Sequence, residues 1–538
     1  MTGHHSKTGI HQHLWVFIFL FLSANFIQGQ ESQAVVQNQM KFGRLLRLID
    51  SYYVDTTNVG SLTEKAIVNL LEDLDPHSAY ISKEEVARMN EPLEGNFEGI
   101  GITFNIFRDT LLVLSVIAGG PSEKVGLMAG DRIIQAGGKK ITGIGLKNED
   151  VFKLLKGPKG TVVNLSVLRK KSTLEFRIIR DKIPIESIDA SYMINAETGY
   201  IKMNKFAATT HDEFKAALEK LKLQRVKNLI LDLRGNGGGY LKSAIDIADE
   251  FLPAEKMIVY TQGVNNPRRD YKSTASGNFE EGKLVVLIDE NSASSSEIVS
   301  GAVQDWDRGI ILGRRSFGKG LVQQPFYLTD GSQVRLTTAH YYTPSGRCIQ
   351  RPYTEGMSEY RNVLQKRMES GELFSADSIS FPDSLRYKTM KSNRTVFGGG
   401  GIMPDIFVPL DSSKHYAYSN QLRRSNIIYN YILEFEDTRR EKLLKKHDTF
   451  SKFNEKFEVT DEMIEEVLLA GEKEKIARVP ESLDFTKNLL KKEIKAFLAR
   501  DLYERGDFYR IYNQEDKVIM KAVEIIGNTG YSSHLGIK

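Results

Sequence analysis

The sequence predicts a multi-domain α/β protein with a β-rich module placed ahead of its α/β core. At 538 residues, the chain is long enough for three or four units. Strands and helices alternate from residue 183 to about 410, as in an α/β domain, whereas residues 93–182 show short strands joined by glycine turns. We therefore expect an N-terminal helical region at 35–92, the β-rich module at 93–182, the core at 183–410 and a helical C-terminal extension at 411–538.

The composition indicates a folded protein with nearly balanced charge. Hydrophobic residues make up 41% and charged residues 26%, and 73 basic against 69 acidic residues give a net charge of +4. This balance gives no reason to expect nucleic-acid binding. Cys348 is the only cysteine, which excludes an internal disulfide, and the histidines are scattered without a metal-binding spacing. We expect no metal and no other cofactor.

The N-terminus has the pattern of a secretory signal peptide, residues 1–29. A weakly basic start precedes the apolar run Leu14–Leu22, and small and polar residues follow. Because the run is shorter than the roughly 20 residues that a spanning helix needs, a signal peptide is favoured over the alternative, a retained membrane anchor. We expect export to a bacterial periplasm, with membrane association only through an uncleaved signal.

The first elements are predicted from the spacing of apolar residues. Helical spacing covers residues 37–89, with a break at Asp75–Pro76. In the β-rich module the predicted strands are 99–106, 111–117, 131–135, 162–168 and 174–179, and the predicted helices lie near 122–127 and 148–155.

In the core, two predicted strands end in tight loops that open helices. Strand 228–233 runs into a glycine loop, Gly235–Gly239, and helix 241–251, while strand 284–288 runs into a serine turn, Asn291–Ser296, and helix 297–305. Such loops are where α/β folds usually place active sites. Strands 200–203 and 309–312 and helix 210–221 complete this pattern.

Beyond residue 411, Lys, Glu and Arg accompany helical patterns at 425–446, 460–475 and 482–509, which indicates a helical appendage with solvated faces.

The serine turn offers candidates for a nucleophile. A serine at the start of a helix lies where free backbone N–H groups can bind an oxyanion. The pattern alone does not choose among the four serines, and a helix cap is the alternative interpretation. The candidates are Ser292, Ser294, Ser295 and Ser296.

Lys319 is the candidate base, flanked by Gly318 and Gly320 and by apolar residues. To act near neutral pH, its pKa would have to fall by about 3 units from about 10.4, a differential cost of roughly 4 kcal/mol. The alternative is an exposed lysine in a glycine turn.

Two other motifs share these residues, and both fail on context. Gly313–Lys319 matches the opening of a phosphate-binding loop, but Gly320 replaces the Ser or Thr that binds magnesium, and strands follow instead of a helix. Ser316–Lys319 matches the S-x-x-K of penicillin-binding enzymes, but its glycines disfavour the required helix, and the only K-T-G is Lys7–Gly9.

Nine segments in order make residues 42–410 resemble the carboxyl-terminal processing peptidases, the tail-specific family of serine endopeptidases. The segments are Leu74–Tyr80, Gly99–Ile102, Gly126–Asp131, Leu155–Gly160, Asp232–Gly239, Ser292–Ile298, Phe317–Gln323, Tyr342–Arg347 and Gly398–Asp405.

The resemblance implies a role for each matching residue. It makes Ser294 the nucleophile, Lys319 the general base and Gln323 the residue that orients the lysine. Asp305 falls where some members have a supporting carboxylate. The implied oxyanion hole consists of the backbone N–H groups of Gly237, Gly238, Gly239 and Ser295.

The β-rich module resembles a PDZ domain. The resemblance implies that Gly99, Ile100, Gly101 and Ile102 bind the C-terminal carboxylate of a peptide through backbone N–H groups, and that the peptide adds as a strand to a sheet edge.

The expected function is that of an exported serine endopeptidase that selects proteins or peptides by apolar C-termini. The alternatives are a non-catalytic PDZ scaffold or ligand-binding protein, and a protease that is inactive until a peptide or partner aligns its dyad. A homo-oligomer and an adaptor partner both stay open.

Overall fold

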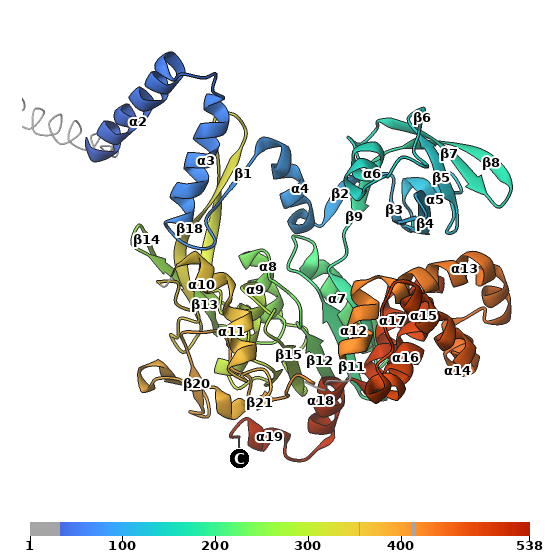
Figure 1. The fold of residues 1–538 in the computed structure, drawn as a ribbon. Helices are drawn as coiled ribbons and strands as arrows, with labels where there is room; N and C mark the ends of the chain where they lie inside the picture. Colours follow the sequence, from blue (N-terminus) through green and yellow to red (C-terminus); the bar gives the residue numbers. More distant parts are fainter. Residues whose placement is uncertain (1–32, 355, 412–415, 538) are drawn as a thin grey trace, which may run out of the picture. The chain divides into compact units, whose positions relative to one another are not determined.

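The computed structural model describes residues 33–354, 356–411 and 416–537, so the predicted signal peptide lies outside the described residues. The chain forms two units, one up to Leu74 and one from Asp75 onward. The first contains helices α2 (Gln33–Tyr52) and α3 (Val59–Glu72), and the side chain of Asn58 caps α3 by accepting a hydrogen bond from the Ser61 N–H (Figure 1). In the described part of the chain, no helix is both long and apolar enough to cross a bilayer.

The β-rich module folds around a small core of its own. Its main sheet runs β3–β4–β5–β7–β8, β6 pairs with β5, and the separate pair β2–β9 forms the two ends through which the module joins the chain. The strand predicted from Gly99 to Ile106 is split in two, because Gly101 adopts a φ of 76°, in the left-handed region that interrupts a strand. The elements are β2 (Asn96–Gly99), β3 (Ile102–Phe107), β4 (Thr110–Val116), α5 (Pro121–Lys124), β5 (Arg132–Ala136), β6 (Lys139–Lys140), α6 (Asn148–Leu155), β7 (Val162–Arg169), β8 (Ser172–Ile179) and β9 (Asp181–Pro184).

The α/β core is built on a six-stranded sheet in the order β10–β11–β12–β15–β16–β21. The strands from β11 to β21 are parallel, and β10 pairs antiparallel at the edge. The elements are β10 (Ile188–Met193), β11 (Thr198–Met203), α7 (Thr210–Leu223), β12 (Asn228–Asp232), α8 (Leu241–Asp249), β15 (Leu284–Ile288), α9 (Ser295–Asp305), β16 (Ile310–Gly313) and β21 (Ile406–Phe407).

Helices cover both faces of this sheet, because successive strand residues point to opposite sides. Leu229 and Leu231 pack with α7, α8 and α9. Ile230, between them, packs on the other face against α18 (Lys517–Gly527), which contributes Ile519 and Ile526 among other apolar residues. Figure 1 shows α18 on the opposite side of β12 and β15 from α8 and α9.

The predicted helical C-terminal extension is confirmed, and it has an apolar core of its own. Residues 416–512 form a helical unit with an apolar core in which Ile428, Ile432 and Phe435 are buried at helical spacing, whereas α18 packs against the sheet of the α/β core. Most of its Lys, Glu and Arg residues lie on the outer faces, although Glu436 and Glu493 are buried. The helices are α12 (Tyr416–Arg424), α13 (Ile427–Lys446), α14 (Phe450–Lys456), α15 (Asp461–Lys473), α16 (Leu483–Leu502), α17 (Arg505–Tyr512) and α19 (Tyr531–His534).

A second sheet lies beside the core and carries part of the site. Its order is β1–β18–β13–β14, with β17 paired to β18. Sequence patterns predicted only helices around β1, whose three residues are too few to show a period. The elements are β1 (Ala79–Ile81), α4 (Lys83–Glu94), β13 (Met257–Gly263), β14 (Asn266–Lys272), β17 (Leu321–Tyr327) and β18 (Gln333–Tyr342), followed by α10 (Met357–Arg361), α11 (Val363–Glu369), β19 (Arg386–Lys388) and β20 (Thr395–Phe397).

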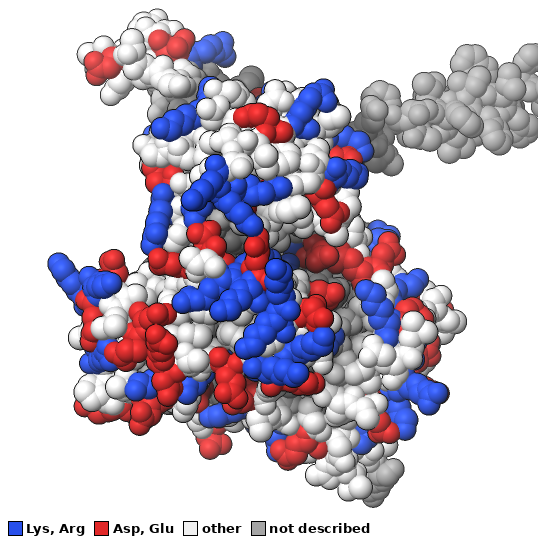
Figure 2. Space-filling model, turned by 90° about the vertical axis from the view of Figure 1, so that its right-hand side faces the viewer, with Lys and Arg blue, Asp and Glu red and all other residues white. Residues whose placement is uncertain are grey.

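Basic and acidic side chains both lie on the face shown in Figure 2, and a group of basic side chains gathers near its middle.

Candidate active site

Three loops at one edge of the core sheet hold the residues singled out in the sequence. β12, β15 and β16 are parallel neighbours, so the chain leaves all three strands at the same edge. The glycine loop follows β12, the serine turn follows β15, and a lysine loop, Arg314–Gly320, follows β16.

The glycine loop touches the serine turn directly at Gly238, where a side chain would not fit. A Cβ atom at Gly238 would lie 2.9 Å from the Cβ of Ser294 and 3.0 Å from the N atom of Ser295. At Gly239 it would lie 2.0 Å from the carbonyl oxygen of Phe206. Any larger residue would push the loop away from the turn.

Three of the four candidate serines use their hydroxyl groups to hold these loops together. Ser292 Oγ donates to the Leu233 carbonyl at 2.9 Å, Ser295 Oγ to the Gly239 carbonyl at 3.0 Å, and Ser296 Oγ to the Asn236 carbonyl at 2.8 Å. The fourth, Ser294, lines a cavity. The structure thereby separates Ser294 from its neighbours, which the sequence pattern did not.

Ser294 has a strained backbone. Its φ is 53° and its ψ is −110°, a conformation rare for a residue with a side chain. It is held there by the Glu297 carboxylate, which accepts from the Ser294 N–H at 2.7 Å, and by Tyr341, whose hydroxyl donates to the Ser294 carbonyl at 3.1 Å. Ser294 is also the N-cap of α9, so the cap interpretation describes its backbone correctly.

Lys319 lines the same cavity, with Gln323 as its partner. Lys319 Nζ donates to Gln323 Oε1 at 2.8 Å, and Gln323 Nε2 donates to the His77 carbonyl at 2.5 Å. Burial lowers the pKa of Lys319 from its ordinary value, although the nearby carboxylates of Asp75 and Glu297 oppose the change. The side chain is thus less protonated than an exposed lysine at the same pH.

One buried carboxylate joins the serine turn to the lysine loop. Besides the Ser294 N–H, Glu297 accepts hydrogen bonds from Ser316 Oγ at 2.5 Å and from the N–H groups of Gly318 at 2.7 Å and Lys319 at 2.9 Å. Its side chain is completely buried, and this burial raises its pKa to about 7 against the opposing effect of the four donors. The sequence places Glu297 at a capping position but gives no sign that it spans two loops.

Backbone N–H groups around Ser294 are available to bind an oxyanion. The N–H groups of Gly237, Gly239 and Ser295 donate no hydrogen bond to any described residue. Gly238 differs, because its N–H donates to the side-chain oxygen of Asn236 at 2.9 Å. Of the four donors implied by the family resemblance, three are therefore free in this conformation.

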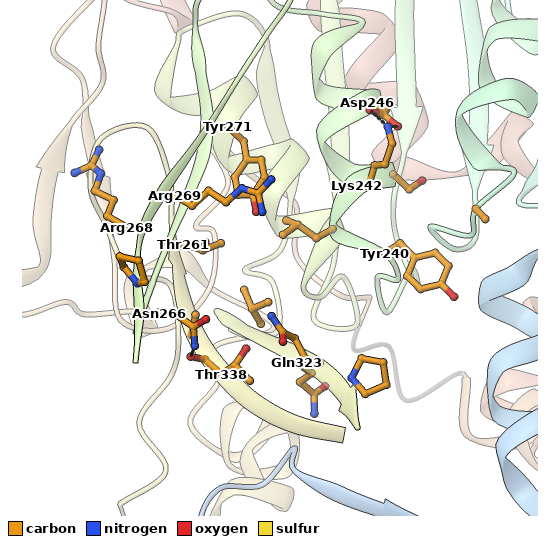
Figure 3. Close-up of a pocket in the computed structure, with 18 of the residues that line it drawn as sticks. Tyr240, Lys242, Asp246, Thr261, Asn266, Arg268, Arg269, Tyr271, Gln323 and Thr338 are labelled. Carbon is orange, nitrogen blue, oxygen red and sulfur yellow. Dashed lines mark hydrogen bonds and ion pairs between the residues drawn. The ribbon is translucent and has the colours of Figure 1, made fainter. Parts of the chain in front are cut away.

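Ser294, Lys319 and the glycine loop border one cavity of about 470 Å³. Its walls include Ser294, Ser295, Lys319, Gln323 and Gly237–Gly239. It shares Gln323, Tyr240, Leu241, Val322 and Pro325 with a second cavity of about 810 Å³. Figure 3 shows this second cavity, with Tyr240 and Lys242 across from Asn266 and Arg268 of the β13–β14 hairpin.

Two groups of singled-out residues lie away from the cavity. Asp305 is fully buried at the C-terminal end of α9, where it pairs with Arg347 at 2.7 Å and accepts from the Ser345 N–H at 2.9 Å. Gly99–Ile102 lies in the β-rich module, where the Ile100 carbonyl accepts from Ser122. Any effect of Asp305 on the reaction must therefore act through the position of α9.

Comparisons with known families agree with this architecture. The model of peptidase family S41 matches residues 197–356, a PDZ-domain model matches residues 99–179, and a family of unknown function (DUF8443) matches residues 418–504. The fold and the family match define a serine peptidase with a PDZ domain.

Individual relatives make the assignment narrower. A carboxy-terminal-processing protease of Bartonella bacilliformis is 35% identical over 343 residues, covering 62% of this chain and 78% of that protein. The carboxy-terminal processing protease CtpB of Bacillus subtilis is 34% identical over 314 residues, covering 57% of this chain and 65% of that protein. A solved photosystem II D1 C-terminal processing protease is 28% identical, covering 58% of this chain and 90% of that chain, with a TM-score of 0.34. The chain belongs to the carboxy-terminal processing proteases.

Proposed function

We propose that this chain is an exported endopeptidase that cleaves proteins with a Ser294–Lys319 dyad after selecting them by apolar C-termini. The observation that carries the proposal is that Ser294, Lys319 and the glycine loop line one cavity. Family membership supplies the reaction class, peptide-bond hydrolysis by a serine peptidase. The roles of the individual residues are our assignment.

In the first half of the reaction, neutral Lys319 accepts the proton of Ser294 Oγ as this oxygen attacks the carbonyl carbon of the peptide bond. Gln323 holds the amine in place through its hydrogen bond at 2.8 Å. The oxyanion that forms is stabilised by the free N–H groups of Gly237, Gly239 and Ser295. Lys319 then returns the proton to the leaving amine, which leaves an ester on Ser294.

In the second half, a water molecule attacks this ester while Lys319 again takes a proton. The C–O bond to Ser294 breaks, Ser294 Oγ recovers its hydrogen, and the carboxylic acid product leaves. The two cavities, of about 470 and 810 Å³, share lining residues, and together they offer more room than a small molecule needs, as an extended polypeptide requires.

Substrate selection is assigned to the PDZ domain. Its Gly99–Ile102 loop leads into β3. The loop offers backbone N–H donors to a carboxylate, and β3 offers a peptide a strand to pair with.

Export is inferred from the apolar run Leu14–Leu22 near the N-terminus. Cell fractionation is the direct check of export, and recovery of the whole pool from the cytoplasm would contradict it.

Replacing either member of the dyad should abolish cleavage. Ser294→Ala and Lys319→Ala are each expected to lower kcat on a protein substrate by at least about a thousandfold, because nucleophile and base act as a unit. The measurement is single-turnover cleavage by purified variants with unchanged circular dichroism. Lys220→Ala, an exposed lysine on α7, is the control and should cleave normally. Substantial cleavage by either dyad variant would refute the assignment.

The cleavage rate should fall in acid. Lys319 acts only when neutral, and Glu297 accepts all four hydrogen bonds only when ionised, so protonation of either group removes activity. Since burial raises the pKa of Glu297 to about 7, log kcat/KM should drop with a slope steeper than one below about pH 7. A profile that stays flat from about pH 9 to about pH 5 would contradict this mechanism.

Blocking the C-terminus of a substrate should weaken its capture. Amidation removes the negative charge that the Gly99–Ile102 loop is proposed to bind, so KM is expected to rise about tenfold or more while kcat changes little. The comparison uses one protein substrate with a free or an amidated apolar tail. Equal KM values for the two forms would argue against carboxylate recognition.

A further inference from the structure

One face of helix α13 carries three acidic side chains in a row. Glu434, Asp437 and Glu441 are spaced by three and four residues, so they project from the same side of the helix. Each forms an ion pair with a residue of the PDZ domain rather than with a neighbour on its own helix. We call these three residues the acidic face of α13.

The cations that meet this face come from three separate segments of the PDZ domain. Arg108, in the turn after β3, lies 2.7 Å from Glu434. Arg132, on β5, lies 2.6 Å from Asp437, and Lys170, in the turn after β7, lies 2.6 Å from Glu441. Only the folded domain brings these segments together, so the match is between two folded surfaces.

An apolar contact lies beside the ion pairs. Phe107 and Leu112 of the PDZ domain and Leu433 of α13 form one buried cluster, in which their exposed fractions are 8%, 4% and 1%. The central pair, Arg132 with Asp437, is the most shielded of the three, whereas the two outer pairs are mostly exposed. A shielded centre with a charged rim is the usual composition of a specific protein interface.

The helical unit that carries α13 is fastened to the core at its other end. α13 and α16 share one apolar core, and α17 follows α16 directly. Arg505 at the start of α17 pairs with Asp189 of β10 at 2.8 Å, and Tyr509 donates a hydrogen bond to the same carboxylate at 3.2 Å. The unit therefore links the PDZ domain to the edge of the core sheet.

Without this link, the PDZ domain would be held mainly by its two covalent connections and by the ion pair of Lys156 with Glu91 of α4. Both connections leave through the short antiparallel pair β2–β9. Domains joined by so small a connection usually move relative to each other. The peptide-binding loop Gly99–Ile102 takes no part in the contact with α13, so docking leaves it open.

We propose that residues 418–504, the segment matched by a family of unknown function, form a docking unit for the PDZ domain of the same chain through the acidic face of α13. The contact is electrostatic at its rim and therefore sensitive to salt. Docking also fixes the direction in which a captured C-terminus is presented to the cavity at Ser294, a role that rests on the proposed function.

Chemical cross-linking measures docking without any substrate. A carbodiimide joins an amine to a carboxylate without a spacer, and the exposed pair of Lys170 and Glu441 is accessible to it. The cross-linked peptides are quantified by mass spectrometry in the full-length protein. Lys242 and Asp246, an ion pair within α8 at 2.7 Å, provide the internal control, because they stay close whether or not the PDZ domain docks.

Charge reversal at the shielded pair tests the contact. Asp437→Arg places two cations opposite each other, as Arg132→Asp does with two anions, and each is expected to lower the Lys170–Glu441 cross-link about tenfold. The double variant Asp437→Arg/Arg132→Asp restores an opposite pair and should recover most of the yield, while the Lys242–Asp246 product stays constant throughout. Unchanged yield in the single variants, or no recovery in the double variant, would overturn the proposal.

Cleavage assays separate docking from its consequence. Asp437→Arg is expected to lower kcat/KM for a protein with an apolar tail about tenfold, to leave a short peptide without such a tail unaffected, and to regain activity in the double variant. If the cross-link responds but Asp437→Arg cleaves the tailed protein normally, the presentation role is refuted. If the cross-link responds but the wild type cleaves nothing, docking stands and the proposed function fails.

Discussion

The hydrogen bonds accepted by Glu297 connect the two loops that carry the proposed nucleophile and base. The carboxylate receives the Ser294 N–H from the serine turn and the Ser316 hydroxyl and two N–H groups from the lysine loop. Bonds to an ionised group are about twice as strong as bonds between neutral groups. In a completely buried position, they fix both the strained backbone of Ser294 and the start of the segment that presents Lys319.

Other parts of the molecule support this connection. The hydroxyl of Tyr341 on β18 lies within hydrogen-bond distance of the carbonyls of both Ser294 and Lys319 and can donate its one hydrogen to either, a second bridge between the same loops. Gln323 ties the lysine to the backbone of His77, next to β1, so the short segment before the PDZ domain contributes to the site. Behind the loops, α18 packs on the second face of the sheet, which makes the C-terminal segment part of the framework that holds the proposed dyad.

The sequence predicts well what depends on local pattern. Helix α6 and strand β15 have the predicted limits, and both strand–loop–helix units of the core are confirmed, because glycine and serine runs interrupt clear apolar periods. The features that the sequence did not reveal depend on long-range contacts. Glu297 looks like an ordinary capping residue, and the burial of α18 depends on a strand face almost 300 residues earlier in the chain. Asp305 lies 305 − 294 = 11 residues after Ser294, about 16 Å along α9, too far to share its cavity.

The most direct test of this account is the rate at which a fluorophosphonate labels Ser294 when Glu297 is changed to Gln. The amide presents an NH2 group to donors that need an acceptor, so labelling should slow by about 10- to 100-fold. Glu290→Gln removes the same charge from the segment that leads into the serine turn, where Glu290 forms an ion pair with Arg314, and should label at close to the wild-type rate. Wild-type labelling of a folded Glu297→Gln protein would contradict the central role of this carboxylate.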